Sequence, residues 1–141
     1  MAWLIDTNLV SDARKPRPDP RIVSFFSTHR TSELYISVVT FAEIRFGIEL
    51  VDDHARRAVL ADWLTLKLRP MFDGRVLPLS EDILLKWRSL MEQGRKSGYT
   101  YSQIDLLIAA TALHHGLTVV TRDRSDYDRA GVSVLNPWED L

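Results

Sequence analysis

Short apolar runs rich in β-branched residues alternate along the chain with longer segments of helical periodicity. We expect strands over Ala2–Ile5, Leu34–Val39, Arg75–Leu79, Leu117–Val120 and Val132–Leu135. A run of this kind, without polar alternation, is typical of a strand buried on both faces. Strands that alternate with helices predict a parallel sheet that is covered by helices on both sides.

The predicted helices carry recognisable end signals. Asp19 and Pro20 suit the N-cap and first position of a helix that continues to about His29. Further helices are expected after Thr40, from about Asp53 to Leu68, from Ser80 to Gly98 and from Ser102 to His115. The last of these is apolar almost all round, which predicts a helix buried in the middle of the fold. Residues 121–131 are expected to form a loop, and residues 6–13 are left unassigned.

The bulk composition fits one globular domain over residues 1–141. Hydrophobic residues make up 45% of the chain and charged residues 26%, as in an ordered protein with a real core. With a formal net charge of −1, nucleic-acid binding would need a local basic patch. The absence of cysteine leaves oxygen and imidazole as metal ligands. No signal peptide or membrane-spanning stretch is visible, so we expect a cytoplasmic protein without a membrane contact.

Four acidic residues stand at the ends of predicted strands or near the starts of helices. Asp6 and Asp123 end the first and fourth strands, and Glu43 lies in the expected first turn of the helix after the second strand. Because strand ends and following helix N-termini share one edge of a parallel sheet, these three side chains are expected to meet there. Asp105 begins the buried helix before the fourth strand, and it reaches that edge only if the fold returns this helix to it.

Each acid also has a simpler interpretation as a cap or a solvated turn residue. Thr40-x-x-Glu43 has the form of a capping box, and Ser102-x-x-Asp105 resembles one. Asp6 and Asp105, however, border apolar segments, where an unpaired charge is costly. Converging carboxylates also repel one another unless a cation neutralises them. The economical solution is Mg²⁺ or Mn²⁺ bound through oxygen, which would polarise a phosphoryl oxygen and activate a water to attack phosphorus.

Five short motifs carry most of these residues, in order along the chain. They are Ile5-Asp-Thr-Asn8, Thr40-Phe-Ala-Glu-Ile-Arg-Phe-Gly47, Asp105-Leu-Leu-Ile-Ala-Ala-Thr-Ala112, Val120-Thr-Arg-Asp123 and Leu135-Asn-Pro-Trp138. The series resembles the motifs of PIN-domain ribonucleases, above all the VapC/FitB toxins of bacterial toxin–antitoxin pairs. The resemblance implies a three-layer α/β/α fold with a central parallel sheet of order 3-2-1-4-5. It also implies a Mg²⁺-dependent endoribonuclease in which Mn²⁺ can substitute, a homodimer, and an antitoxin partner that inserts into the active-site groove.

The resemblance assigns roles to particular acids. Asp6, Glu43 and Asp105 match three acids of the family and Asp123 matches the fourth, as catalytic groups and metal ligands. Asp6 and Asp105 are the first candidates for direct ligands. Many FitB-like relatives have Asn at the position of Asp123 and Asp three residues later, whereas this chain has Asp at both. We therefore assign Asp123 as the inner acid and Asp126 to the periphery of the metal site or to a loop cap.

Short polar and basic residues beside the acids are candidates for holding RNA. Thr7, Asn8 and Thr121 offer groups that can hydrogen-bond to the acids or to the substrate. Arg45 and Arg122 are close to the acids in sequence and suit phosphate contacts. Ordinary solvated surface charge explains these two arginines equally well.

Other functions remain to be compared with this hypothesis. The first is a PIN-like binding module whose main role is the antitoxin complex; the presence of all four acids argues against a degenerate site. A phosphate-accepting receiver or phosphatase needs an Asp after the third strand, where the sequence is Leu77-Pro-Leu-Ser80. A Ser/His/Asp hydrolase needs an exposed serine on a glycine-flanked turn, which we do not find.

Overall fold

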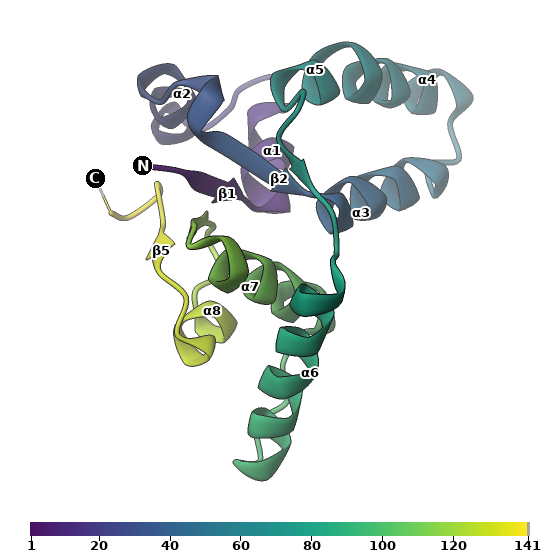
Figure 1. The fold of residues 1–141 in the computed structure, drawn as a ribbon. Helices are drawn as coiled ribbons and strands as arrows, with labels where there is room; N and C mark the ends of the chain where they lie inside the picture. The colour runs from purple at the N-terminus through teal and green to yellow at the C-terminus, as the bar shows by residue number, and fades with distance from the viewer. Residues whose placement is uncertain (141) are drawn as a thin grey trace.

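The computed structural model describes residues 1–140, which contain a five-stranded parallel sheet (Figure 1). The strands are β1 (Trp3–Ile5), β2 (Leu34–Ser37), β3 (Val76–Leu77), β4 (Thr118–Val120) and β5 (Val134–Leu135). Their order in the sheet is β3-β2-β1-β4-β5, and every neighbouring pair runs parallel. This confirms the predicted fold class and strand order.

Helices cover both faces of the sheet (Figure 1). One face carries α1 (Thr7–Ala13), α2 (Pro20–Thr28), α3 (Val38–Glu49), α4 (His54–Trp63), η2 (Leu64–Leu68) and α5 (Arg69–Met71). The opposite face carries α7 (Gln103–His115) and α8 (Ser125–Ala130), with α6 (Glu81–Lys96) packed against α7. A short 3₁₀ helix, η1 (Thr31–Glu33), leads into β2.

Two apolar clusters meet the sheet from its two faces. Ile5 and Val120 belong to the cluster under α1 and α2, whereas their neighbours Leu4 and Val119 belong to the cluster under α7. Successive residues of a strand point to opposite faces, so a sheet covered on both sides needs apolar residues at every position. This explains the unbroken apolar runs of β1 and β4.

The boundary between β2 and α3 differs from the prediction. Ser37 ends the strand, and its hydroxyl accepts a hydrogen bond from the Val39 N–H (3.0 Å), which caps α3. The prediction that Thr40 opens this helix was wrong, because serine is a strong N-cap and begins the helix three residues earlier. Thr40 is buried inside α3 and Glu43 lies in its second turn, so their capping box does not form.

Two short helices, α1 and α8, were not predicted. They have seven and six residues, which is too short for an apolar periodicity to show in the sequence. Isolated helices of this length are not stable in water, so packing against the sheet must hold them. Helix α1 begins directly after Asp6, and α8 occupies part of the segment that was expected to be a loop.

The predicted helix from Asp53 to Leu68 continues to Met71. The carboxylate of Asp53 accepts the N–H of Ala55 (2.9 Å) and caps the start as expected. Pro70 lies inside the last turn instead of beyond it. Proline has no N–H, and the five-residue π-helical segment η2 precedes it, where the regular hydrogen-bond ladder changes its spacing.

Helix α7 is buried through its middle, as predicted, and it returns Asp105 to the carboxyl edge of the sheet. Gly116 ends the helix in the left-handed conformation (φ 67°) and turns the chain directly into β4. The helix therefore runs back against the direction of β4, and its N-terminal turn lies where the strands end. No helix between residues 1 and 140 is both long and apolar enough to cross a membrane.

Gly94 permits the close packing of α6 against the segment that leads into α7. A Cβ at this position would lie 2.8 Å from the Tyr99 carbonyl oxygen and 2.9 Å from the Tyr101 ring. We expect Gly94→Ala to lower the free energy of unfolding by about 1–2 kcal/mol, because the clash with backbone outweighs the better helix propensity of alanine. Urea unfolding followed by far-UV circular dichroism measures the change.

Gly47→Ala is the matched control for this prediction. Gly47 lies inside α3, and a Cβ there would meet no atom within 4 Å. The gain in helix propensity then acts alone, and we expect a stabilisation of about 0.5–1 kcal/mol. Equal effects of the two substitutions would contradict the packing argument.

Candidate active site

Asp6 is buried at the end of β1 and is the most extensively hydrogen-bonded of the predicted acids. Its side chain is 5% exposed. Oδ1 accepts the Thr7 N–H (2.8 Å), and Oδ2 accepts the hydroxyls of Thr121 (2.8 Å) and Tyr127 (3.2 Å). Burial raises the pKa of Asp6, and the three hydrogen bonds oppose that rise. The result is a carboxylate that is held in one orientation although it is removed from water.

Asp105 is half-buried in the first turn of α7, at the same edge of the sheet. Burial, followed by the negative charges of Asp6, Asp126 and Asp123, raises the pKa of Asp105 to about 6. A carboxyl whose pKa lies so near neutrality is a frequent feature of functional sites.

The capping-box interpretation of Asp105 is not supported by the geometry. Ser102 makes no side-chain hydrogen bond to the start of α7. Its backbone N–H, which a capping box would direct to Asp105, donates instead to Oδ2 of Asp126 (2.8 Å). The carboxylate of Asp105 is therefore not used in a cap.

Asp126 anchors α8 to the start of α7. Its carboxylate accepts both the Ser102 N–H and the Tyr99 hydroxyl. Of the two predicted roles for Asp126, the geometry fits the loop cap. Asp126 still contributes electrostatically to the site, because its charge helps to raise the pKa of Asp105.

Asp123 lies just beyond β4, exposed to solvent and connected to Asp6 through Thr121. The Thr121 hydroxyl donates to Asp6 and accepts the N–H of Asp123 (3.1 Å) and the side-chain amide of Asn8 (3.1 Å). The same Asn8 amide lies 3.4 Å from Oδ2 of Asp123. Thr121 is completely buried, so its hydroxyl is available to Asp6 and the Asp123 N–H and is not exposed to a substrate. Thr7 and Asn8 are half-buried at the surface of the site.

Glu43 differs from the other acids in its surroundings. Its side chain is exposed on α3, and its charge is not among those that raise the pKa of Asp6 or Asp105. It lines a mostly apolar groove between α3 and α4. The lining residues are Ser11, Arg14, Glu43, Ile44, Gly47, Ile48, Val51, Arg56, Leu60 and Trp63.

The donor set of Asp6 and Asp105 fits a hard divalent cation. Between residues 1 and 140, no three histidine, aspartate or glutamate side chains converge closely enough to form a complete ligand set. Mg²⁺, however, is commonly held by one or two carboxylates and keeps several waters. Burial and the neighbouring negative charges raise the pKa of Asp105, and a cation would relieve the repulsion among those charges. The residues therefore fit a two-carboxylate magnesium site.

The arginines near the site differ in how many contacts their side chains make with other residues of the protein. The guanidinium of Arg122 stacks 4.2 Å above the ring of Trp138, and Arg124 bonds to Asp140 (2.7 Å). These contacts fasten the loop after β4 to the C-terminal turn. Arg45 is exposed on α3 and has no ion-pair partner in the described part of the chain. Arg45 is thus the more available of the two predicted phosphate contacts.

Tyr127 is a site residue that the sequence analysis missed. It is fully buried on α8, and burial together with Asp6 and Asp105 raises the pKa of its hydroxyl, which keeps the proton available for donation. The one available signal was a polar aromatic side chain close after Asp123. In a segment expected to be a loop, that signal does not distinguish a site tyrosine from a packing residue.

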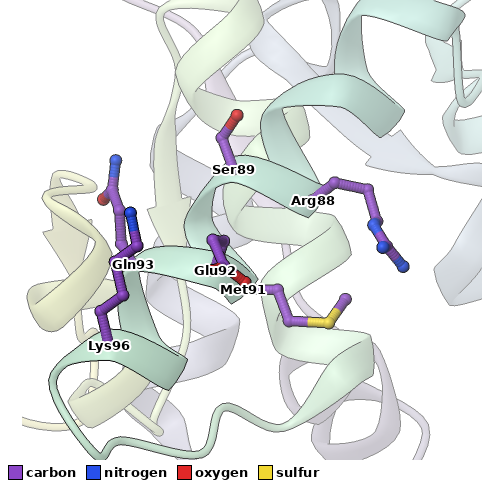
Figure 2. A pocket seen from close by; sticks show the side chains of 6 residues that line it. All are labelled: Arg88, Ser89, Met91, Glu92, Gln93 and Lys96. Carbon is purple, nitrogen blue, oxygen red and sulfur yellow. The ribbon is translucent and has the colours of Figure 1, made fainter.

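A second hollow lies on the outer side of α6 and lacks the chemistry of a site (Figure 2). Its lining residues are Arg88, Ser89, Met91, Glu92, Gln93 and Lys96. The single carboxylate among them, Glu92, is paired with Arg95 at 2.6 Å. The acidic edge of the sheet is therefore the better candidate.

Fold and site together define an α/β protein with an acidic pocket at the carboxyl edge of a parallel sheet. The family model described as "PIN domain" matches residues 3–132. The chain belongs to the PIN-domain family, within its VapC/FitB group of toxins.

Relatives of similar length support this assignment. The chain is 37% identical to "VapC ribonuclease Y4jK" of Sinorhizobium fredii over 136 residues, which cover 96% of this chain and 97% of that protein. It is 35% identical to "Toxin FitB" of Neisseria gonorrhoeae over 137 residues, which cover 97% and 99%. The crystal structure of FitAcB from Neisseria gonorrhoeae superposes with a TM-score of 0.91 at 34% identity, covering 97% of this chain and 99% of that one.

Proposed function

We propose that this protein is a Mg²⁺-dependent endoribonuclease and the toxin of a toxin–antitoxin pair. The observation that carries the proposal is the pairing of buried Asp6 with Asp105, whose pKa is raised to about 6 in part by that neighbour. Two relatives carry the words "ribonuclease" and "toxin" in their names, which supports RNA as the substrate class.

Asp6 and Asp105 would be the direct ligands of Mg²⁺, or of Mn²⁺ in its place. When bound, the ion would supply Lewis-acid polarisation of a phosphoryl oxygen and a water of lowered pKa. Asp123, exposed beside the pair, would accept a proton from the attacking water as a general base. Glu43 would complete the site through a water.

The substrate backbone would be held by groups around the rim of the pocket. Thr7 and Asn8 are half-buried beside Asp6 and can hydrogen-bond to phosphate oxygens. Arg45 and Arg122 are exposed and provide positive charge on either side. Because the net charge of the chain is −1, these local charges carry the electrostatic part of RNA binding.

The groove between α3 and α4 is the surface that we propose for the antitoxin. It joins apolar side chains such as Ile48 and Trp63 with the charged groups Arg14, Arg56 and Glu43. An amphipathic partner segment could bury its apolar side there and pair its charges at the rim. A solved relative described as FitAB bound to a DNA fragment, with a TM-score of 0.90 at 33% identity, supports a two-protein assembly.

A homodimer belongs to the same proposal. Leu84 and Leu85 on α6 are 38% and 66% exposed, which leaves apolar surface for a second copy of the chain.

The decisive experiment is cleavage of a total-RNA pool by purified protein free of antitoxin, with Mn²⁺ or with excess EDTA. We expect discrete fragments from the wild type with Mn²⁺, and none in EDTA or from Asp105→Asn. The reason is that the metal and the carboxylate are both needed to stabilise charge on the phosphoryl group. Sequencing the fragment ends would identify the RNA.

Two outcomes would contradict the proposal. Full cleavage in excess chelator would rule out the metal mechanism. A folded wild type without metal-dependent cleavage would favour the alternative of a binding module whose main role is the antitoxin complex. Glu43 is exposed and its charge does not raise the pKa of Asp6 or Asp105, and this observation keeps the alternative under test.

A further inference from the structure

We propose that Tyr127 is a positioning residue that orients the carboxylate of Asp6 toward the cation. The inference rests on the proposed function, because it assigns a task within the same metal site. The residue carries an aromatic hydroxyl at the base of the acidic pocket, on a helix that the sequence did not predict.

The hydroxyl of Tyr127 is buried and directed at the acids. The residue is 0% exposed, and its hydroxyl donates to Oδ2 of Asp6 at 3.2 Å. The single proton of this hydroxyl is thus used on Asp6, which also accepts the hydroxyl of Thr121 from the end of β4.

Packing alone does not account for a tyrosine at this position. The ring belongs to the apolar cluster under α7, with Leu4, Ile108 and Val119 among its members. Phenylalanine would fill the same space without bringing a polar group into the core. A buried hydroxyl costs free energy unless it is hydrogen-bonded, and in the described residues its partner is Asp6.

The hydrogen bonds to Asp6 leave the carboxylate in a defined orientation. A carboxylate has about four acceptor positions on its two oxygens. The Thr7 N–H takes one on Oδ1, while Thr121 and Tyr127 occupy Oδ2. The remaining acceptor position is on Oδ1, and the three donors fix where it points. Partners of this kind orient a metal ligand before the metal arrives.

The position of Tyr127 is itself secured by its neighbour in sequence. Asp126 accepts the Tyr99 hydroxyl and the Ser102 N–H, which joins the start of α8 to the start of α7. Asp105 lies three residues after Ser102 on the same helix. The anchor at Asp126 thus sets the distance between the donor on α8 and the acid on α7.

The test is a titration of the antitoxin-free protein with Mn²⁺. Electron paramagnetic resonance measures the concentration of unbound ion at each point. We expect Tyr127→Phe to weaken the Mn²⁺ Kd by about tenfold or more, as loss of a partner of a metal ligand commonly does. Tyr101→Phe is the matched control. Tyr101 is also buried, and its hydroxyl forms no hydrogen bond with the described residues, so its loss should leave the Kd unchanged.

Thermal unfolding of the metal-free variants separates positioning from a merely structural role. A lower Tm of Tyr127→Phe with an unchanged Mn²⁺ Kd would overturn the inference. If Tyr127→Phe does not fold, Tyr99→Phe replaces it, because it removes a donor to Asp126 that anchors α8 and forms no hydrogen bond to Asp6 or Asp105. That variant should weaken the Kd by about a few-fold, and an unchanged Kd would overturn the inference.

The outcome for the wild type distinguishes this inference from the proposed function. Mn²⁺ binding that Asp6→Asn abolishes, with equal affinity in wild type and Tyr127→Phe, overturns only the role of Tyr127. A wild type that does not bind Mn²⁺ overturns both.

Discussion

Asp6→Asn is expected to abolish RNA cleavage and to leave a folded protein that is more stable than the wild type when no metal is present. The loss of activity should exceed about 1000-fold, because a direct ligand of the cation contributes several kcal/mol of charge stabilisation at tenfold per 1.36 kcal/mol. The gain in stability follows from burial. Asp6 is 5% exposed and its pKa is raised, so its ionised form costs folding free energy at neutral pH.

The hydrogen-bond network explains why the fold should survive this substitution. With its oxygen on the side of Thr121 and Tyr127, asparagine can still accept both hydroxyls and gives up only the bond from the Thr7 N–H. Thr121 keeps its direction in this arrangement, because its two acceptor positions are taken by the Asp123 N–H and the Asn8 amide.

Asp53→Asn is the matched control. Asp53 is an exposed N-cap of α4, where asparagine caps equally well, so activity and stability should stay at the wild-type level. Cleavage assays with Mn²⁺ and metal-free urea unfolding give both readouts. Wild-type cleavage by Asp6→Asn would remove this carboxylate from the proposed mechanism.

Asp105→Asn is expected to be more stable than the wild type without metal and less stable than the wild type with Mn²⁺. Without metal at about pH 8, the variant should be more stable by about 1–2 kcal/mol. This follows because the pKa of Asp105 rises from 3.8 in its ordinary state to about 6 in the fold. With Mn²⁺ at about 100 times its Kd, the wild type should gain about 2.7 kcal/mol and become the more stable protein.

The pH dependence of this difference has a definite sign. A carboxyl whose pKa is raised by folding binds more protons in the folded state, so it destabilises the fold only when it is ionised. The penalty is absent below the unfolded pKa near 3.8 and is complete above the folded pKa of about 6. The metal-free advantage of Asp105→Asn should therefore shrink as the pH falls from about 8 to about 4.

Urea unfolding across that range, with and without Mn²⁺, measures both effects. An advantage of the variant that stays constant with pH would show that the charge of Asp105 is not its cause. A wild type that gains nothing from Mn²⁺ would contradict a metal site at this position.

The order of elements and the identity of the central acids were predictable from local sequence. The apolar runs around Leu4 and Val119 indicated strands buried on both faces, and the pairing order confirms this. Asp105 was singled out because it borders an apolar helix, and its predicted role as a ligand came from the resemblance to PIN-domain ribonucleases. Periodicity and end signals are local properties of the chain, which is why they could be recognised without the fold.

The prediction from local sequence was wrong where two residues could each have been the N-cap of α3. Thr40 and Ser37 are both acceptable N-caps, and the sequence favoured Thr40 because Val38 and Val39 have β-branched side chains that suit a strand. The backbone instead enters α3 at Val38, with the Ser37 hydroxyl bonded to the Val39 N–H. The capping interpretation of Glu43 depended on that boundary and was lost with it.

The sequence by itself determined a parallel α/β sheet, its strand segments and the acids at its carboxyl edge, because each follows from side-chain type and spacing along the chain. Only the tertiary structure decided which groups meet those acids. It placed Tyr127 against Asp6, Asp126 against the start of α7, and Glu43 in the groove between α3 and α4. Contacts between residues more than 20 positions apart depend on how α7 and α8 pack on the sheet, and no local pattern encodes that packing.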